Sequence, residues 1–247
     1  MFGPWNVVIG GAAALALLLT GAAYRAEPAA AAAARAERQV QVPIARRNLP
    51  VVITKVTLGS TVVQAGRFTR PRPVIDSTTP FEADGDWIQN LTIYLLNRTS
   101  RTIVFARILL IFPETGDGVT RPYRIHPLDL GRMPAGAAFM SNGELLSQPP
   151  ERAPLSFEPG QTMAVALGDH IDRIRSGVQS VIPVAAATKL KIDLNQFCFV
   201  DAMRWAAGGF EYPDPQHPGK WKYRGSAYFP GDIDSNWPGL PGWVGLQ

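Results

Sequence analysis

The sequence contains very little cysteine and histidine. Cys198 is the only cysteine among 247 residues, which excludes an intrachain disulfide framework and any zinc or iron-sulfur site built from several thiolates. The three histidines, His126, His170 and His217, have no spacing typical of metal ligands. The chain also lacks a Gly-x-Ser-x-Gly elbow, a phosphate-binding glycine loop and a dinucleotide fingerprint. We therefore predict no catalytic residue, no metal and no cofactor.

Charged residues are scarce as well. They make up 18% of the chain, below the ~25% of ordinary soluble domains, whereas apolar residues make up 46%. This composition excludes a disordered chain and favours a packed core. Most of the net charge of +4 lies at residues 25–47, which hold five arginines and two glutamates. Only about +1 remains for the rest of the chain, so the sequence predicts no nucleic-acid partner.

An apolar run opens the chain. Residues 7–19 are uncharged, and small residues at 21–23 follow them, which is the pattern of a signal peptide. About 19 residues, 5–23, would also just span a bilayer as a helix. No basic residue precedes the run and several follow it, which the positive-inside rule associates with a domain facing the cytoplasm. Between these alternatives we expect export to the periplasm, cell surface or medium, with residues 1–23 either cleaved or retained as a membrane anchor.

Residues 24–47 are rich in alanine and arginine. This composition is typical of a solvated, partly helical tether. The alternative is that the arginines attract anionic lipid headgroups beside a membrane.

Residues 48–200 show the alternation typical of strands. We expect strands over 50–63, 86–96, 102–112, 162–167 and 189–200, the last of which buries Cys198 as a small apolar side chain. The strands at 86–96 and 102–112 are predicted to form a hairpin around a polar turn at 97–100. Asp169 is predicted to cap a short helix that buries Ile171, Ile174 and Val178 on one face.

This order of elements predicts an all-β fold, an antiparallel sandwich with one short helix. The polar turn at 97–100 between two apolar strands, followed by the turn dipeptide Pro159-Gly160, resembles bacterial exported immunoglobulin-like sandwich proteins. The resemblance implies an immunoglobulin-like β-sandwich over residues 48–200. It is one of architecture alone, and the paired cysteines of antibody domains are absent.

The tail at 201–247 is rich in aromatic residues and proline. One interpretation is that it packs on the sandwich and covers an open edge or face. The other is an exposed surface for a partner protein or an envelope polysaccharide. The candidate binding residues are Trp205, Trp221, Tyr223, Trp237 and Trp243.

We therefore expect a non-catalytic binding or scaffold module, exported or anchored in the membrane, that serves as an envelope protein or as an accessory subunit of a membrane complex. Two alternatives remain open. One is a carbohydrate-binding module that uses the tail aromatics. The other is a hydrolase with carboxylates such as Asp201, Glu211 or Asp214.

Overall fold

The computed structural model describes most of the chain after residue 34. The described residues are 35–42, 49–65, 78–134, 140–141, 144–145, 153–206, 209–214, 216–217 and 220–225. They all belong to one compact unit, Ala32–Gln247. The expected apolar helix at 1–23 and the residues Trp237 and Trp243 lie outside the described residues.

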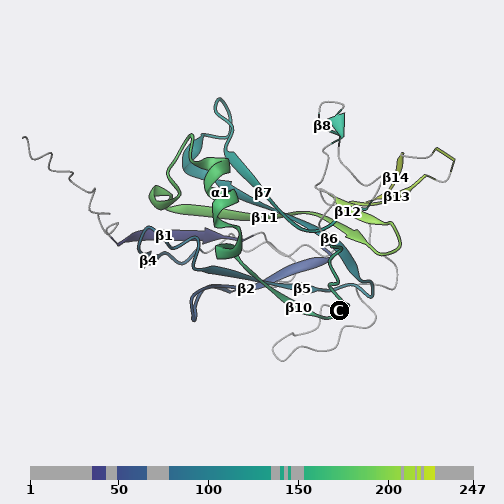
Figure 1. The fold of residues 1–247 in the computed structure, drawn as a ribbon, viewed down its shortest axis with the longest axis horizontal. Coiled ribbons are helices and arrows are strands. Elements are labelled where there is room, and N and C mark those ends of the chain that lie inside the picture. Colours follow the sequence, from purple (N-terminus) through teal and green to yellow (C-terminus); the bar gives the residue numbers. More distant parts are fainter. Residues whose placement is uncertain are drawn as a thin grey trace, which may run out of the picture. The chain divides into compact units, whose positions relative to one another are not determined.

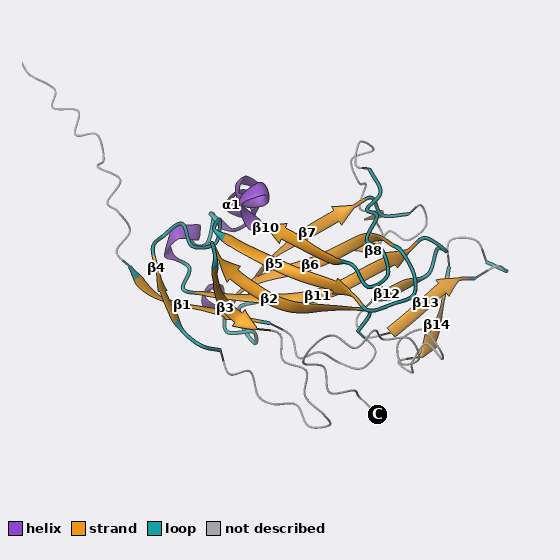
Figure 2. Cartoon of the chain, turned by 90° about the horizontal axis from the view of Figure 1, so that it is seen from below, coloured by secondary structure: helices purple, strands orange, loops and turns teal. Residues whose placement is uncertain are grey.

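Strands dominate, and they form two main sheets (Figures 1 and 2). The larger sheet contains β1 (Ala36–Gln41), β4 (Phe81–Ala83), β6 (Ile103–Phe112), β7 (Arg124–Gly131), β11 (Lys189–Phe199), β12 (Arg204–Ala206), β13 (Gly209–Pro213) and β14 (Trp221–Gly225). The smaller sheet contains β2 (Val51–Leu58), β3 (Thr61–Ala65), β5 (Leu91–Asn97) and β10 (Thr162–Ala166). The short strands β8 (Met140–Ser141) and β9 (Glu144–Leu145) pair with each other. The prediction of an all-β, two-sheet fold is confirmed at this level.

Helical segments are few and short among the described residues. They are α1 (Ile171–Val178) and the 3-10 turns η1 (Pro113–Thr115), η2 (Leu167–His170) and η3 (Val184–Ala186). The prediction that Asp169 caps α1 is wrong, because Asp169 lies inside η2 and His170 occupies the N-cap without a side-chain hydrogen bond. None of these helices has the length and apolar character needed to cross a membrane.

The core lies between the two sheets, where burial alternates along much of β5, β6 and β11. Ile93 and Leu95 of β5, with Ile108 and Leu110 of β6, are fully buried in the same hydrophobic cluster. Removing each such side chain from water contributes about 1.5 to 3 kcal/mol to folding, before the loss of chain entropy is counted. The two-residue period of the sequence therefore directs one face of each sheet inward.

The predicted hairpin of residues 86–112 is wrong in two respects. First, residues 85–90 form turns, and β5 begins only at Leu91. Second, β5 pairs with β2 and β10 in the smaller sheet, whereas β6 pairs with β7 and β11 in the larger one. The polar segment at 97–100 therefore carries the chain from one sheet to the other.

Asn97 fixes this crossing through a buried polar network. Its side-chain amide donates hydrogen bonds to the carbonyl oxygens of Arg101 and Phe157, each at 2.8 Å. Its side-chain oxygen accepts from the backbone N–H and the hydroxyl of Thr99, at 2.9 and 2.8 Å. These four bonds satisfy a side chain with no solvent exposure, as burial of an amide requires.

β1 departs from the expected tether and from purely antiparallel pairing. It lies within residues 24–47, pairs parallel with β11 and antiparallel with β4, and buries Val40. This strand was not predicted because the inward-facing positions of residues 36–41 include a basic side chain, Arg38, so the segment lacks a clear alternation of apolar residues.

Replacing Asn97 with alanine is expected to destabilise the protein strongly. The substitution removes the four hydrogen bonds of a buried side chain and leaves the backbone N–H of Thr99 without its acceptor. We expect a loss of about 3 kcal/mol. Urea unfolding followed by tryptophan fluorescence measures the change. The exposed Asn90→Ala is the matched control, and equal stability of the two variants would contradict the assigned role of Asn97.

Candidate functional site

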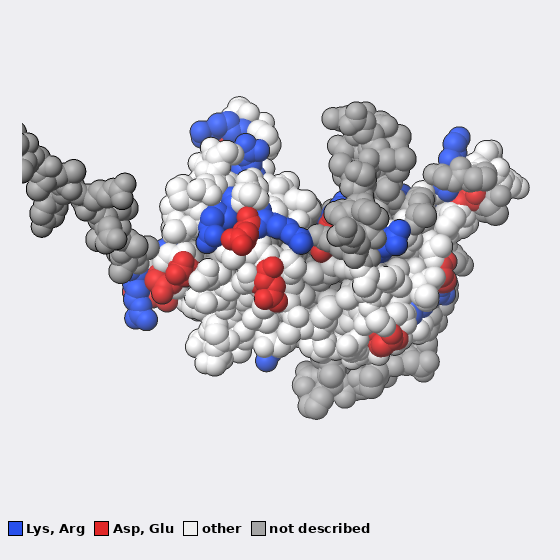
Figure 3. All heavy atoms as spheres, viewed as in Figure 1, with Lys and Arg blue, Asp and Glu red and all other residues white. Residues whose placement is uncertain are grey.

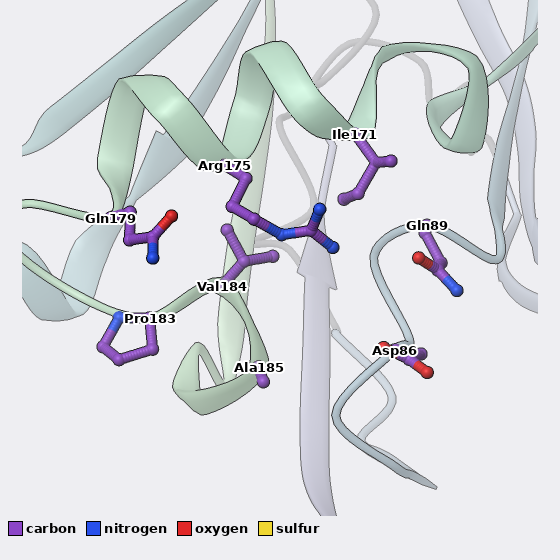
Figure 4. Close-up of a pocket in the computed structure, with 8 residues that line it drawn as sticks. All are labelled: Asp86, Gln89, Ile171, Arg175, Gln179, Pro183, Val184 and Ala185. Atoms are coloured by element: carbon purple, nitrogen blue, oxygen red, sulfur yellow. The ribbon is translucent and has the colours of Figure 1, made fainter. Parts of the chain in front are cut away.

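A small hollow lies beside α1. Its volume is about 140 Å³, and Figure 4 shows the side chains around it. They come from α1, from η3 and the residue before it, and from the turns that precede β5. The lining residues are Asp86, Gln89, Ile171, Arg175, Gln179, Pro183, Val184 and Ala185.

The helical wall is amphipathic, which explains both its position and its chemistry. Ile174 and Val178 are fully buried and hold α1 against the body, while Arg175 lies on the other face with 45% of its side chain exposed. One guanidinium nitrogen of Arg175 donates to Asp172 at 3.0 Å. Because exposed i,i+3 ion pairs contribute little, this pair orients the guanidinium more than it stabilises the helix.

The opposite wall, formed by the turns at 85–90, is anchored by Trp87. The indole is fully buried, and its N–H donates to the carbonyl oxygen of Ala187 at 2.9 Å. On the helical side, a Cβ added at Gly168 would lie 2.9 Å from the carbonyl oxygen of Gln89. A glycine is therefore needed for the turns to approach η2 this closely.

Arg38 of β1 connects the turns before β5 to the segment around η3. Its guanidinium donates to the carbonyl oxygens of Ala187 at 2.7 Å, Ala185 at 3.3 Å and Asp84 at 3.4 Å. It is only 3% exposed, and its Cζ lies 6.0 Å from the centroid of the Trp87 ring. Backbone carbonyls and an aromatic face therefore compensate the buried charge. The turns and the η3 segment are held at a fixed separation.

The hollow combines opposite charges with an apolar surface. Arg175 supplies a cation and Asp86 an anion, while Gln89 and Gln179 supply amides that both donate and accept hydrogen bonds. Its volume is below the ~300 to 1,000 Å³ of sites for drug-sized ligands. The arrangement suits recognition of a molecule of few atoms, and none of the lining residues is a serine, cysteine or histidine nucleophile.

The aromatic residues predicted to form a binding surface do not share one environment. Trp205 in β12 is 3% exposed and its ring centroid lies 5.7 Å from that of Phe197 in the main core. Trp221 in β14 is half-buried against the separate cluster of Phe105, Met133 and Cys198. The guanidinium carbon of Arg204 lies 4.1 Å from the centroid of the Trp221 ring. One face of that ring is therefore occupied by a cation.

Tyr223 belongs to β14, but its side chain is not among those described. Trp237 and Trp243 lie outside the described residues. The structure therefore places Trp205 in β12 and Trp221 and Tyr223 in β14 of the larger sheet, with β13 between the two strands. The two described tryptophans belong to different clusters.

The carboxylates considered for hydrolysis each pair with a basic side chain. Asp201 pairs with Arg101, and Glu211 with Arg204 at 2.5 Å. Asp214 accepts from His217 at 2.8 Å and from Lys222 at 3.0 Å. The pair of Asp201 joins the turn after β11 to the segment before β6, and the other pairs organise β12 to β14 and the turn between β13 and β14.

Asp214 has a strongly shifted acidity. Burial by itself raises the pKa of Asp214, but hydrogen bonds from His217, a backbone N–H and Lys222 outweigh it and lower the pKa to about 2. The carboxylate therefore stays ionised at neutral pH and acts as an acceptor for the turn around it.

Cys198 and His126 are packed against neighbouring residues. Burial raises the pKa of the Cys198 thiol to about 12, so the thiol is an apolar group at neutral pH. Burial lowers the pKa of His126, whose ring lies against Gly177 of α1. Among the described residues, no three histidine, cysteine or acidic side chains are grouped as metal ligands.

Comparison of the chain with protein-family models, with curated proteins and with solved structures found no match.

Removal of the Arg38 guanidinium is expected to lower the free energy of unfolding, because the same contacts hold the fold and the walls of the hollow. Arg38→Met keeps the length of the side chain but removes a hydrogen bond from the carbonyl oxygens of Asp84, Ala185 and Ala187, the last of which keeps only Trp87 as its donor. We expect this change to cost about 2 to 4 kcal/mol. Urea unfolding measures the loss, with the exposed Arg35→Met as the control on the same segment. Unchanged stability of Arg38→Met would show that the three contacts contribute nothing.

The pKa of Asp214 predicts a pH-dependent loss of stability. Because the folded pKa of about 2 lies below the ordinary value of 3.8, the carboxylate stabilises the fold fully above about pH 5, and this contribution disappears as the pH falls toward 2. Asp214→Asn should lower stability at neutral pH and flatten the pH dependence in that window, compared with Asp172→Asn at a 93% exposed position. Parallel pH profiles for wild type and Asp214→Asn would refute the assignment.

Proposed function

We propose that the chain is a non-catalytic binding module of the cell envelope, exported and either anchored through residues 5–23 or released after their cleavage. The observation that carries the proposal is the hollow beside α1, which has opposite charges on facing walls and a geometry fixed by Arg38 and Trp87. Preorganised polar groups of this kind favour binding because little order is lost when a ligand enters. The protein then acts by holding a molecule, with no chemistry performed on it.

The position of β1 supports attachment of the body close to a membrane. Twelve residues, 24–35, separate the end of the apolar run from Ala36 at the start of β1. Fully extended, they reach at most about 40 Å. A retained anchor would therefore keep the hollow within a short distance of the bilayer surface, which suits an accessory subunit of a membrane complex.

The proposal includes an immunoglobulin-like topology for the sandwich. Its support is the crossing between the two sheets at 97–100 and the turn at Pro159-Gly160, where Gly160 has a φ of +70°. The backbone N–H of Gly160 donates to the carbonyl oxygen of Asn97 at 2.9 Å, so the two features that carry the resemblance are in contact.

Fractionation of cells that produce the native chain tests the proposed location. We expect the protein in membrane or envelope fractions, because the apolar run directs export or anchoring. Mass spectrometry of the purified chain then separates the two forms, since a retained anchor leaves the full 26.8 kDa and cleavage removes the first residues. A soluble cytoplasmic pool that retains Met1 would refute the proposed location.

A further inference from the structure

We infer that the hollow beside α1 binds a zwitterionic α-amino acid with an aliphatic side chain no larger than that of leucine. This inference rests on the proposed binding function and names its ligand class. It follows from three features of the lining: a cation on one wall, an anion on the other and an apolar surface between them (Figure 4).

Arg175 provides the site for the carboxylate. A guanidinium carries five N–H donors in a planar fork that matches a carboxylate in bidentate geometry. Asp172 accepts from one terminal nitrogen of Arg175, and the other nitrogens remain to donate to a ligand. Figure 4 shows the guanidinium between Ile171 and Val184, reaching toward the wall that carries Gln89.

Asp86 provides the site for the ammonium group. Its backbone N–H donates to the side chain of Asp84 at 3.1 Å, which fixes the turn, while its carboxylate accepts no hydrogen bond from the other described residues. Gln89 lies on the same wall and adds an amide oxygen as a second acceptor. The Asp86 carboxylate and the Gln89 amide oxygen both attract an ammonium group, whereas a neutral amide in its place would gain much less binding free energy.

The remaining surface and the volume restrict the side chain of the ligand. Ile171, Pro183 and Val184 supply apolar contacts, so burial of an aliphatic side chain is favourable. A hollow of about 140 Å³ has room for a small amino acid and excludes a folded peptide or an oligosaccharide. The opposite charges on its walls also disfavour an isolated anion or cation, because each would meet repulsion from one wall.

The geometry of the walls does not depend on the ligand. Arg38 ties the backbone at Asp84 to that at Ala185 and Ala187, and Trp87 adds a second bond to Ala187. Asp86 lies between two of these fixed points along the chain. The turn that carries Asp86 is thus held in place before a ligand enters, which lowers the entropic cost of binding.

Titration of the full isotope-labelled chain in detergent micelles with L-leucine tests the inference. Amide chemical shifts of α1 and of residues 84–90 are expected to change saturably, with a millimolar dissociation constant. N-acetyl-leucine lacks the ammonium group and leucinamide lacks the carboxylate, so each should bind at least about tenfold more weakly.

Two variants with matched controls locate the site. Arg175→Gln and Asp86→Asn are each expected to weaken leucine binding at least about tenfold, whereas Arg173→Gln on the same helix and Glu82→Gln at an exposed position of β4 should leave it unchanged. The amide spectrum of each variant reports directly that it is folded.

The inference is overturned if leucine causes no saturable shift, or if Arg175→Gln binds leucine as wild type does. Equal binding of N-acetyl-leucine would also overturn it, by revealing a site for carboxylates alone. These outcomes leave the cell fractionation result untouched, so failure of the ligand assignment and failure of the proposed location are distinguishable.

Discussion

The carbonyl oxygen of Ala187 receives hydrogen bonds from two buried side chains, the guanidinium of Arg38 and the indole of Trp87. Three separate parts of the chain meet there: the N-terminal strand, the turns before β5 and the segment that follows η3. A buried guanidinium is tolerated only where enough acceptors surround it, and here backbone carbonyls supply them. Because these carbonyls belong to the segments that line the hollow, one buried cation both closes the fold and shapes the candidate site.

Through Arg38, the strand β1 is connected directly to the segments that line the hollow. β1 lies beside β11 and β4 in the larger sheet, and Arg38 extends from it toward the turns. Figure 3 shows scattered charges of both signs on the described surface in this view. The binding proposed for this protein therefore depends on local geometry more than on a broad electric field.

Much of the strand pattern could be predicted from the sequence, because alternation over Lys189–Phe199 and Thr162–Ala166 reports burial on one face. The partner of each strand could not. Alternation in β5 and β6 is the same whether they pair with each other or lie in opposite sheets. The bond from Asn97 to the carbonyl oxygen of Phe157, sixty residues away, helps to fix the second arrangement, and no sequence pattern predicts it.

The candidate site was invisible in the sequence for a similar reason. Arg38 stands in a basic, alanine-rich segment where a solvated arginine is the ordinary expectation, and the alternation of Arg38 with Val40 on one face was the sole local signal. Asp86 and Arg175 are separated by almost ninety residues, so no spacing rule connects them. The alternation over 86–96 places Trp87 in a strand, whereas Trp87 lies in turns and its indole N–H donates to a carbonyl oxygen one hundred residues away.

The parallel pairing of β1 with β11 has a mechanical consequence. A pulling force applied to the residue before β1 and directed along the strand would load the bonds to β11 and β4 in shear. Bonds loaded in this way share the force and rupture together, unlike those of a hairpin peeled from its end. The body would therefore resist extraction by its leading segment, and the hydrogen bonds of Arg38 would add to this resistance.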